Sequence, residues 1–235
     1  MKALILAGGK GRRLAPYTTI LPKPLCPVGD MPILEVILRQ LKQAGVSEVT
    51  LCVGYLGTLL EAYFGHGEKI GLRLNYSYES KPLGTAGPLA LIDPPTEPFL
   101  VMNGDILTTL SFASLVADHK SSRRVATVCA FDKKVHIDLG ILEVDVKKKI
   151  TEYIEKPTLN YRVSMGIYMF DPEVLTRIRR NEYLDLPDLI RALIKAEASV
   201  GIYQEDCKWL DIGRPEDYSL ANDEFEHHKN LFLPG

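Results

Sequence analysis

The stretch KALILAGGKGRRLAPYTTILPKP, residues 2–24, decides the fold, because an apolar strand runs directly into a glycine-rich, basic loop. Residues 2–7 have the continuous apolar character of a buried strand. Helical spacing of apolar residues begins only near residue 32. The connection is therefore about 20 residues long, where connections in α/β proteins usually take about 2–6. A loop of that length at the end of a buried strand indicates function.

The rest of the first half alternates strand and helix patterns. A helix is predicted over 32–45, with Gly45 as its natural end. The further predicted elements are strands at 48–54, 72–78 and 98–105, a helix at about 56–64 and a short helix from about Thr85. Strands that alternate with helices predict a mainly parallel α/β sheet.

After residue 120 the pattern changes to strand-like runs separated by short polar segments. The runs are RVATVCAF (124–131), LGILEVD (139–145), KITEYIEK (149–156) and VSMGIYMF (163–170). Between the middle two, VDVKKKI is expected to form the solvated tip of a hairpin. Helices are predicted near 172–180, 186–197 and 215–228. This half should contain more antiparallel sheet than the first.

Composition places the chain among compact globular proteins and excludes several partners. It has 235 residues, of which 46% are apolar and 25% charged, and a net charge of −2. That charge argues against binding to nucleic acid or to an anionic membrane, and the first apolar run is too short for a signal sequence or a membrane span. Four cysteines without paired spacing indicate a reducing compartment. We therefore expect a cytoplasmic protein.

The opening loop concentrates positive charge in this net negative chain. Residues 1–29 contain no acid and five bases, Lys2, Lys10, Arg12, Arg13 and Lys23. Arg13 could place its forked guanidinium on phosphate oxygens, and Lys23 could supply a point charge. A polyphosphate ligand is the partner that such a loop suits.

Three glycines would let backbone N–H groups approach that ligand. Gly8, Gly9 and Gly11 carry no Cβ that would block a phosphate or a base. The loop contains neither GxxxxGK[ST] nor a GxGxxG that opens a helix, which excludes the P-loop and dinucleotide-binding fingerprints. For the glycines alone, a structural turn with a solvated basic face is an equal alternative.

The combination GGxGxRLxPxTxxxPKPL, over residues 8–25, resembles the signature of the sugar-1-phosphate nucleotidylyltransferases. The resemblance implies a Rossmann-like, GT-A-like α/β fold with a mixed, mainly parallel central sheet and an antiparallel sugar-binding part. It implies one domain over 1–235, with the nucleotide bound by about 1–120 and the sugar phosphate by about 121–235. Arg13 matches the family's catalytic arginine, whereas Arg12 stands where the family usually has threonine and has no assigned role.

Further motifs extend the resemblance on the nucleotide side. The LGTAG core at 83–87 resembles that of mannose-1-phosphate guanylyltransferases, whereas thymidylyltransferases of the family usually carry a GLAQA-like version. A carboxylate at Glu79 suits guanine, whose N1–H and N2–H₂ groups are adjacent donors. The nucleotide-binding residues implied are Leu6, Ala7, Gly8, Gly9, Gly11, Arg13, Glu79, Gly84, Thr85 and Asn103.

Two acidic segments predict a metal site. Nucleotidyl transfer needs a divalent cation, and Mg²⁺ is commonly held by one or two carboxylates. Asp105 in NGD follows a buried strand, at the edge where α/β sheets bind ligands, and Asp211 lies in WLDIGRPEDY. Taken alone, each is as well explained as a turn or loop residue. The resemblance implies that both hold Mg²⁺, with Arg13, Lys23 and Asp105 as the catalytic set.

The prediction of a sugar-phosphate site rests on the order of the motifs along the chain. By the resemblance, Lys23, Gly140, Glu155, Lys156 and Gly166 contact the sugar phosphate. Leu139 stands where the family often has tyrosine, and residues 164–165 stand where it often has Asn-Ala. These departures leave the identity of the sugar open.

The resemblance predicts synthesis of a nucleoside-diphosphate sugar and pyrophosphate from an NTP and a sugar-1-phosphate, with GTP and mannose-1-phosphate favoured. Alternatives are UTP, CTP or dTTP, another acceptor such as glucose-1-phosphate, heptose-1-phosphate or a cyclitol phosphate, and a catalytically silent regulatory subunit. A related glycosyltransferase is disfavoured because NGDI has one aspartate where a DxD motif has two. The C-terminal hexapeptide repeats of many guanylyltransferases do not occur in this sequence, and assembly into a homo-oligomer is left open.

Overall fold

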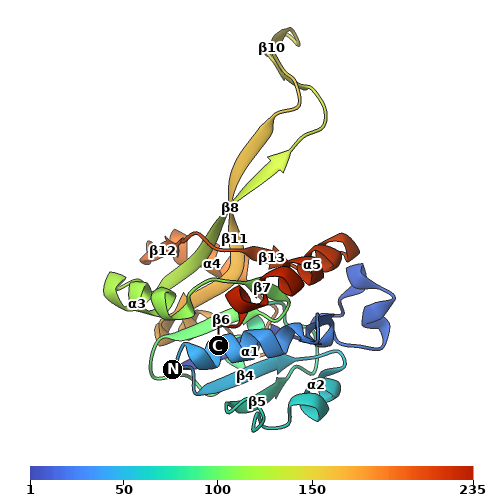
Figure 1. Cartoon of the computed structure of the whole chain (residues 1–235). Coiled ribbons are helices and arrows are strands. Elements are labelled where there is room, and N and C mark those ends of the chain that lie inside the picture. Colours follow the sequence, from blue (N-terminus) through green and yellow to red (C-terminus); the bar gives the residue numbers. More distant parts are fainter. Residues whose placement is uncertain (235) are drawn as a thin grey trace.

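The computed structural model of the chain describes residues 1–234 and is built on one seven-stranded sheet (Figure 1). The strand order is β12-β8-β11-β6-β1-β4-β5. These strands are β1 (Lys2–Ala7), β4 (Glu48–Val53), β5 (Arg73–Tyr78), β6 (Phe99–Asn103), β8 (Ala126–His136), β11 (Thr158–Phe170) and β12 (Val200–Tyr203). Pairing is parallel except that β11 is antiparallel to both of its neighbours. The sheet is therefore mixed and mainly parallel, as predicted.

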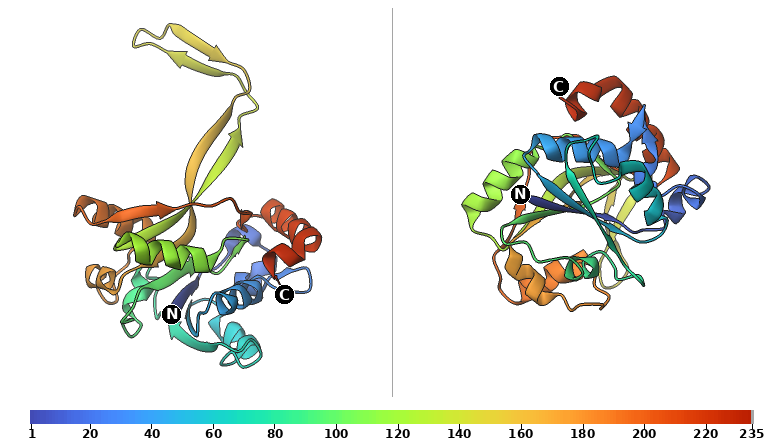
Figure 2. Two further views of the ribbon diagram at one scale, coloured as in Figure 1. Left: turned by 60° about the vertical axis from the view of Figure 1, so that its left-hand side comes forward. Right: turned by 90° about the horizontal axis from the view of Figure 1, so that it is seen from below.

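Helices cover both faces of this sheet (Figure 2). The α-helices are α1 (Ile33–Gln43), α2 (Gly57–Phe64), α3 (Phe112–Ser122), α4 (Leu186–Lys195) and α5 (Pro215–Phe232). Short 3₁₀ turns are η1 (Arg12–Leu14), η2 (Tyr17–Thr19), η3 (Lys23–Leu25), η4 (Gly87–Ala90) and η5 (Pro172–Arg177). The predicted helices at about Thr85 and at 172–180 are thus 3₁₀ turns.

Alternation along the central strand β1 divides the core into two layers. Ala3, Ile5 and Ala7 point to one face and pack in the cluster that includes α1, α2, α3 and α5. Leu4 points to the other face and packs in the cluster that includes η4, η5 and α4. Every second residue of a strand lies on the same face, so a strand buried on both sides is apolar throughout.

Three small two-stranded pairings complete the chain. They are β2 (Pro27–Val28) with β3 (Met31–Pro32), β7 (Ile106–Thr108) with β13 (Trp209–Asp211), and β9 (Ile141–Val144) with β10 (Ile150–Ile154). The β7–β13 pair matters for function, because it aligns Asp211 with Ile106 directly after the end of β6. The buried amide of Gln40 on α1 donates to Thr108 O at 2.7 Å and to Phe232 O at 2.8 Å, which joins α1, β7 and α5.

A β-ribbon extends away from the body in Figure 1 and in the left view of Figure 2, and we call residues 132–162 the arm. Its base is the continuation of β8 and β11, which stay paired as far as His136 and Thr158. Its outer part is the β9–β10 hairpin, whose tip is the predicted turn at 145–149. No residue of the arm is buried.

Two further features concern the hydrophobicity of the helices and the state of the cysteines. Within residues 1–234, no helix combines the length and the apolar character needed to cross a membrane. All four cysteines are free, and burial raises the pKa of Cys52 to about 12, so this thiol stays protonated at neutral pH.

Candidate active site

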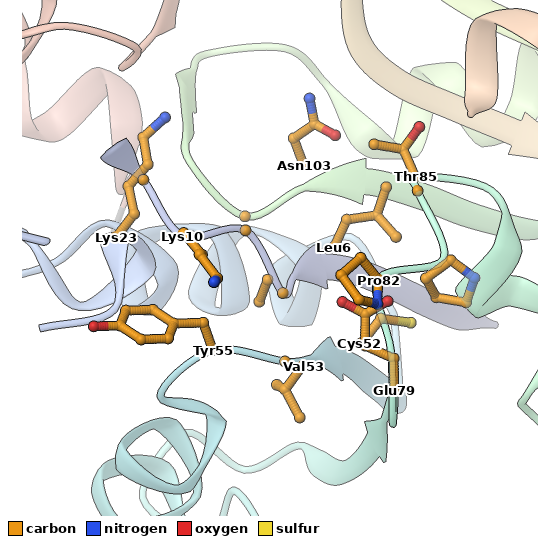
Figure 3. A pocket seen from close by; sticks show the side chains of 18 of the residues that line it. Leu6, Lys10, Lys23, Cys52, Val53, Tyr55, Glu79, Pro82, Thr85 and Asn103 are labelled. Carbon is orange, nitrogen blue, oxygen red and sulfur yellow. The ribbon is translucent and has the colours of Figure 1, made fainter. Parts of the chain in front are cut away.

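A cavity of about 920 Å³ opens at the carboxyl ends of the parallel strands (Figure 3). Four neighbouring strands contribute lining residues from their last positions and from the segments that follow them. These residues are Leu6 to Gly9 at β1, Cys52 to Tyr55 at β4, Ser77 and Glu79 to Pro82 at β5, and Asn103 to Asp105 at β6. The strand order reverses at β1, because β4 and then β5 lie on one side of it and β6, the next strand of the sheet, lies on the other, so the cavity lies at a switch point. Ligands of open α/β sheets bind at this place.

The long loop after β1 is fixed by a close contact at Gly11. This residue has a φ of +59°, in the left-handed region, and a side chain here would bring its Cβ within 2.8 Å of Thr18 Cγ2. The Thr18 hydroxyl donates to Gly11 O at 2.7 Å. Only glycine combines that backbone conformation with that contact. The loop, whose residues 8–13 line the cavity, is therefore held in a defined conformation.

Arg13, Lys23 and Asp105 line one end of the cavity, and Asp211, which is not itself a lining residue, lies beside them next to Ile106. The Lys23 ammonium, almost fully buried, forms an ion pair with Asp105. A Cβ on Gly213 would lie 3.4 Å from Arg13 Nη1, so Arg13 lies against the turn that follows Asp211. The structure thus brings together Arg13 and Lys23 from the opening loop, Asp105 from the end of β6 and Asp211 from β13, which are three distant parts of the sequence.

The electrostatics of Asp211 reflect this crowding. The pKa of its carboxyl is raised. The larger cause is that the surrounding protein displaces part of the water around the carboxyl, although the residue keeps solvent contact, and the second cause is the negative charge of Asp105. Lys23 and Arg13 act in the opposite direction. Two neighbouring carboxylates that repel each other are a donor set that suits a hard divalent cation. Residues 1–234 contain no cluster of three or more His, Cys, Asp or Glu side chains that could hold an ion.

The opposite end of the cavity is built around Glu79 and the loop 83–86. Glu79 Oε2 accepts a hydrogen bond from Leu83 N at 2.9 Å, and Oε1 faces Gly8 and Gly54 so closely that a Cβ on either residue would lie 3.0 or 2.8 Å from it. The carboxylate is therefore held in position at the cavity wall, next to Cys52 and Pro82 (Figure 3).

Thr85 is held by a residue that the sequence did not single out. Its N–H and hydroxyl both donate to Asp185 Oδ1, at 3.0 and 3.2 Å, and its hydroxyl accepts from Leu186 N at 2.7 Å. The Tyr183 hydroxyl donates to the other oxygen of Asp185 at 2.8 Å. Burial opposes the charged form of Asp185, but these hydrogen bonds outweigh it and lower the pKa of the carboxyl.

The cavity wall is cationic even though the chain is net negative. Its charged side chains are five bases, Lys10, Arg12, Arg13, Lys23 and Lys81, and three acids, Glu79, Asp105 and Asp185. The Lys10 ammonium lies 6.0 Å from the centre of the Tyr55 ring, which also lines the cavity. An anionic ligand is favoured by this balance.

The predicted sugar-side residues divide into two groups. Gly166, with a φ of +73°, lies against the cavity residue Asn103, because a Cβ at 166 would lie 2.6 Å from Asn103 Nδ2. Gly140, Glu155 and Lys156 lie on the arm instead, and Lys156 pairs with Asp138 at 3.0 Å. Among the described residues, none between Asp105 and Tyr183 lines the cavity.

The residues that the sequence did not reveal come from short or irregular segments. Tyr183 and Asp185 precede α4, and Gly213 precedes α5. Asp185 could be recognised as the N-cap position of a helix that starts with Leu-Pro, although its side chain makes no capping hydrogen bond. Its partner Thr85, however, lies 100 residues earlier.

The geometry agrees with a comparison against protein families, in which the family model described as Nucleotidyl transferase matches residues 2–228. The chain belongs to this family. Mannose-1-phosphate guanyltransferase beta-A of Xenopus laevis is 35% identical over 229 residues, which cover 93% of this chain and 62% of that protein. The UTP–glucose-1-phosphate uridylyltransferase of Synechocystis sp. is 32% identical over 257 residues, which cover 100% of this chain and 66% of that protein.

A solved structure supports the same fold assignment. A putative glucose-1-phosphate thymidylyltransferase from Bacillus anthracis superimposes with a TM-score of 0.77 at 25% identity, covering 95% of this chain and 94% of that one. The chain spans 62% of the length of the Xenopus relative.

Proposed function

We propose that this chain transfers a nucleotidyl group from an NTP to a sugar-1-phosphate, with GTP and mannose-1-phosphate as the favoured pair. The observation that carries the proposal is the cavity at the switch point of the sheet. Its basic glycine loop, with Arg13 and Lys23, faces Asp105 at one end, and Glu79 with Thr85 forms the other. This arrangement offers one end to phosphates and the other to a base.

In the proposed reaction, an oxygen of the sugar phosphate attacks the α-phosphorus of the NTP. The new P–O bond forms as the bond between the α-phosphorus and the bridging oxygen breaks, and pyrophosphate leaves with the electron pair. The monoester has a second pKa near about 6, so its oxygen is largely ionised at neutral pH and needs no general base. Arg13 would stabilise the charge on the phosphates, and Lys23 would position them.

The residues present fit Mg²⁺, which Asp105 and Asp211 would hold together with oxygens of the substrate. When bound, the ion neutralises charge on the phosphoryl oxygens. The raised pKa of Asp211 beside Asp105 supports this assignment, because a cation would relieve the repulsion between the two carboxylates. Lys23 forms an ion pair with Asp105, so one of the two carboxylates already has a cationic partner.

The choice of base is supported by Glu79 and by the relatives. Glu79 is fixed by Leu83 N–H and presents Oε1 to the cavity wall, where it could accept hydrogen bonds from guanine. The Xenopus relative is named a guanyltransferase, but the Synechocystis and Bacillus anthracis proteins are named for UTP and for thymidylyl transfer. Another NTP or another sugar phosphate is therefore the second candidate.

A substrate matrix tests the proposal. Five NTPs are combined with mannose-, glucose- and heptose-1-phosphate and with a cyclitol phosphate, and pyrophosphate release is measured. We expect the GTP and mannose-1-phosphate pair to give the highest kcat/KM. A clear preference for UTP or dTTP would overturn the base assignment, and no turnover with any pair would overturn the proposed activity.

Replacing Asp185 by alanine is expected to raise the KM for the NTP about tenfold with a smaller change in kcat. The hydrogen bonds that fix Thr85 are each worth about 1 kcal/mol, or more for a charged partner, so their loss frees the loop that would face the base. Steady-state kinetics with varied NTP measures the effect. Asp188→Ala, which removes an exposed ion pair with Arg191 one turn further along α4, is the control and should leave KM unchanged.

A further inference from the structure

The turn after β4 places an aromatic side chain against the glycine loop. Gly57 N donates a hydrogen bond to Gly54 O at 3.1 Å, and Leu56 within this turn has a φ of +57°. A left-handed conformation is uncommon for leucine, and backbone strain of this kind persists only where the surrounding structure requires it. The turn brings Tyr55 to the cavity wall, where its ring lies beside Lys10 (Figure 3).

Tyr55 contacts the glycine loop both at its beginning and further along. Its N–H donates to Gly8 O at 3.4 Å, and its hydroxyl donates to Thr19 O at 2.8 Å. Gly8 directly follows β1, and Thr19 is the last residue of η2. The hydrogen bond from Thr18 to Gly11 O closes the loop on itself, whereas Tyr55 attaches the loop to the end of β4. One residue thus braces most of the loop from outside.

The Lys10 ammonium is the third contact of Tyr55. It lies 6.0 Å from the centre of the ring, at the outer limit of a cation–π contact. None of the ion pairs within residues 1–234 involves Lys10, whereas Lys23 in the same cavity pairs with Asp105. A lysine side chain is long and flexible, so the ring beside it restricts the directions in which the ammonium can point. Lys10 is therefore a directed cation that is available to an anion.

The turn also lies against the end of the cavity that holds Glu79. A Cβ on Gly54, directly before Tyr55, would lie 2.8 Å from Glu79 Oε1 and 3.0 Å from Gly8 O. In the view of Figure 3, Lys10 lies between Lys23 and Glu79. A ligand whose base lay near Glu79 and whose phosphates extended toward Lys23 would pass Lys10.

We propose that Tyr55 is a positioning residue, which holds the glycine loop and directs the Lys10 ammonium to the triphosphate of the NTP. Its N–H and hydroxyl fix the loop at Gly8 and Thr19, and its ring supports the lysine. The proposal rests on the proposed function, because it takes the anion in the cavity to be the triphosphate. Since Tyr55 acts through the loop and Lys10, its loss should appear in KM for the NTP rather than in kcat.

A double-mutant cycle tests this role. Tyr55→Phe removes only the hydroxyl and is expected to raise the KM for the NTP about fourfold, whereas Tyr55→Leu also removes the ring and should raise it about 20-fold. The change in kcat should stay below about threefold. In a Lys10→Met chain, Tyr55→Leu should raise KM no further than Tyr55→Phe does, because the ring then has no cation to support. Fully additive effects of Tyr55→Leu and Lys10→Met would overturn the proposal.

Tyr63→Leu is the matched control for the loss of an aromatic side chain. Tyr63 lies on α2, is 49% exposed and is not among the described residues that line the cavity. We expect an unchanged KM. The melting temperatures of the Tyr55 variants should stay within about 5 °C of the wild type, since the contacts that they lose are few and partly exposed. A rise in KM for Tyr63→Leu equal to that of Tyr55→Leu would contradict a specific role for Tyr55.

A binding measurement needs no turnover and so separates failure of this inference from failure of the proposed function. Inorganic tripolyphosphate is titrated into each protein without Mg²⁺, and its Kd is measured by calorimetry. We expect Kd to rise about fourfold in Tyr55→Phe and about tenfold or more in Tyr55→Leu and in Lys10→Met, and to stay constant in Tyr63→Leu. An unchanged Kd in the Tyr55 variants, or no binding by the wild type, would overturn the inference. Binding that depends on Tyr55 and Lys10 in a protein that releases no pyrophosphate would contradict only the proposed function.

Discussion

Replacing Arg13 by alanine is expected to lower kcat/KM about 10³-fold, because arginines that stabilise charge in phosphoryl transfer contribute at least that much. Arg13 lies against Gly213 beside Asp211, at the end of the cavity that would take the triphosphate. Most of the loss should appear in kcat, since the charge to be stabilised develops during the reaction. Rates of pyrophosphate release at saturating and at limiting NTP concentrations give kcat and kcat/KM separately.

Arg12→Ala is the matched control for this variant. Arg12 is also exposed and also lines the cavity, but it has no assigned role. We expect less than a tenfold change in kcat/KM. Equal losses in the two variants would show that the loop acts only through its total charge, which would contradict a specific role for Arg13.

Replacing Asp211 by asparagine is expected to lower kcat by a factor of about 10² or more when Mg²⁺ is present at about 1 mM. The Mg²⁺ concentration that gives half-maximal activity should rise more than about tenfold. The variant keeps one of the two proposed ligands, Asp105. Its melting temperature without metal should equal or exceed that of the wild type, because a neutral amide no longer repels the Asp105 carboxylate. Loss of activity without loss of stability would separate a role in the site from a role in folding.

The same experiment has a control and a contrary outcome. Asp206→Asn changes an exposed carboxylate five positions earlier that has no hydrogen-bond or ion-pair partner among the described residues, and should behave as the wild type does. A chelator should abolish the activity of all three proteins. Undiminished pyrophosphate release by Asp211→Asn at low Mg²⁺ would contradict the metal assignment.

The sequence predicted the regular elements of the nucleotide half well. β1, α1, β4, α2, β5 and β6 were recognised because each has a long apolar run or a helical period. It missed the helix α3, the strand β12 and the short strands β2, β3, β7 and β13. A strand of three or four residues, such as β7 or β13, has too few positions to show a period, and its partner is selected by tertiary contacts rather than by local sequence.

The residues of the site likewise divide into those that the sequence predicted and those that it did not. The glycine loop, Glu79, Thr85, Asn103 and Asp105 were predicted, and the structure places them around one cavity. The sequence marks Asp185 only as a residue before a helix start, and its role at the cavity could not be predicted, because its contact with Thr85 depends on how α4 packs beside η4. The position of the arm could not be predicted either, since alternating strand patterns fix pairing but not the direction in which a ribbon leaves a sheet.

The β7–β13 pair also determines when the site can form during synthesis. The hydrogen bond from the Thr108 hydroxyl to Lys208 O joins residues 100 positions apart, and Asp211 lies three residues further on. At about 5–20 residues per second, a ribosome needs roughly 5–20 s to make that intervening chain. Throughout this interval the glycine loop, Lys23 and Asp105 are already synthesised, whereas Asp211 is not. The pair of carboxylates therefore cannot assemble until the chain has been made past residue 211.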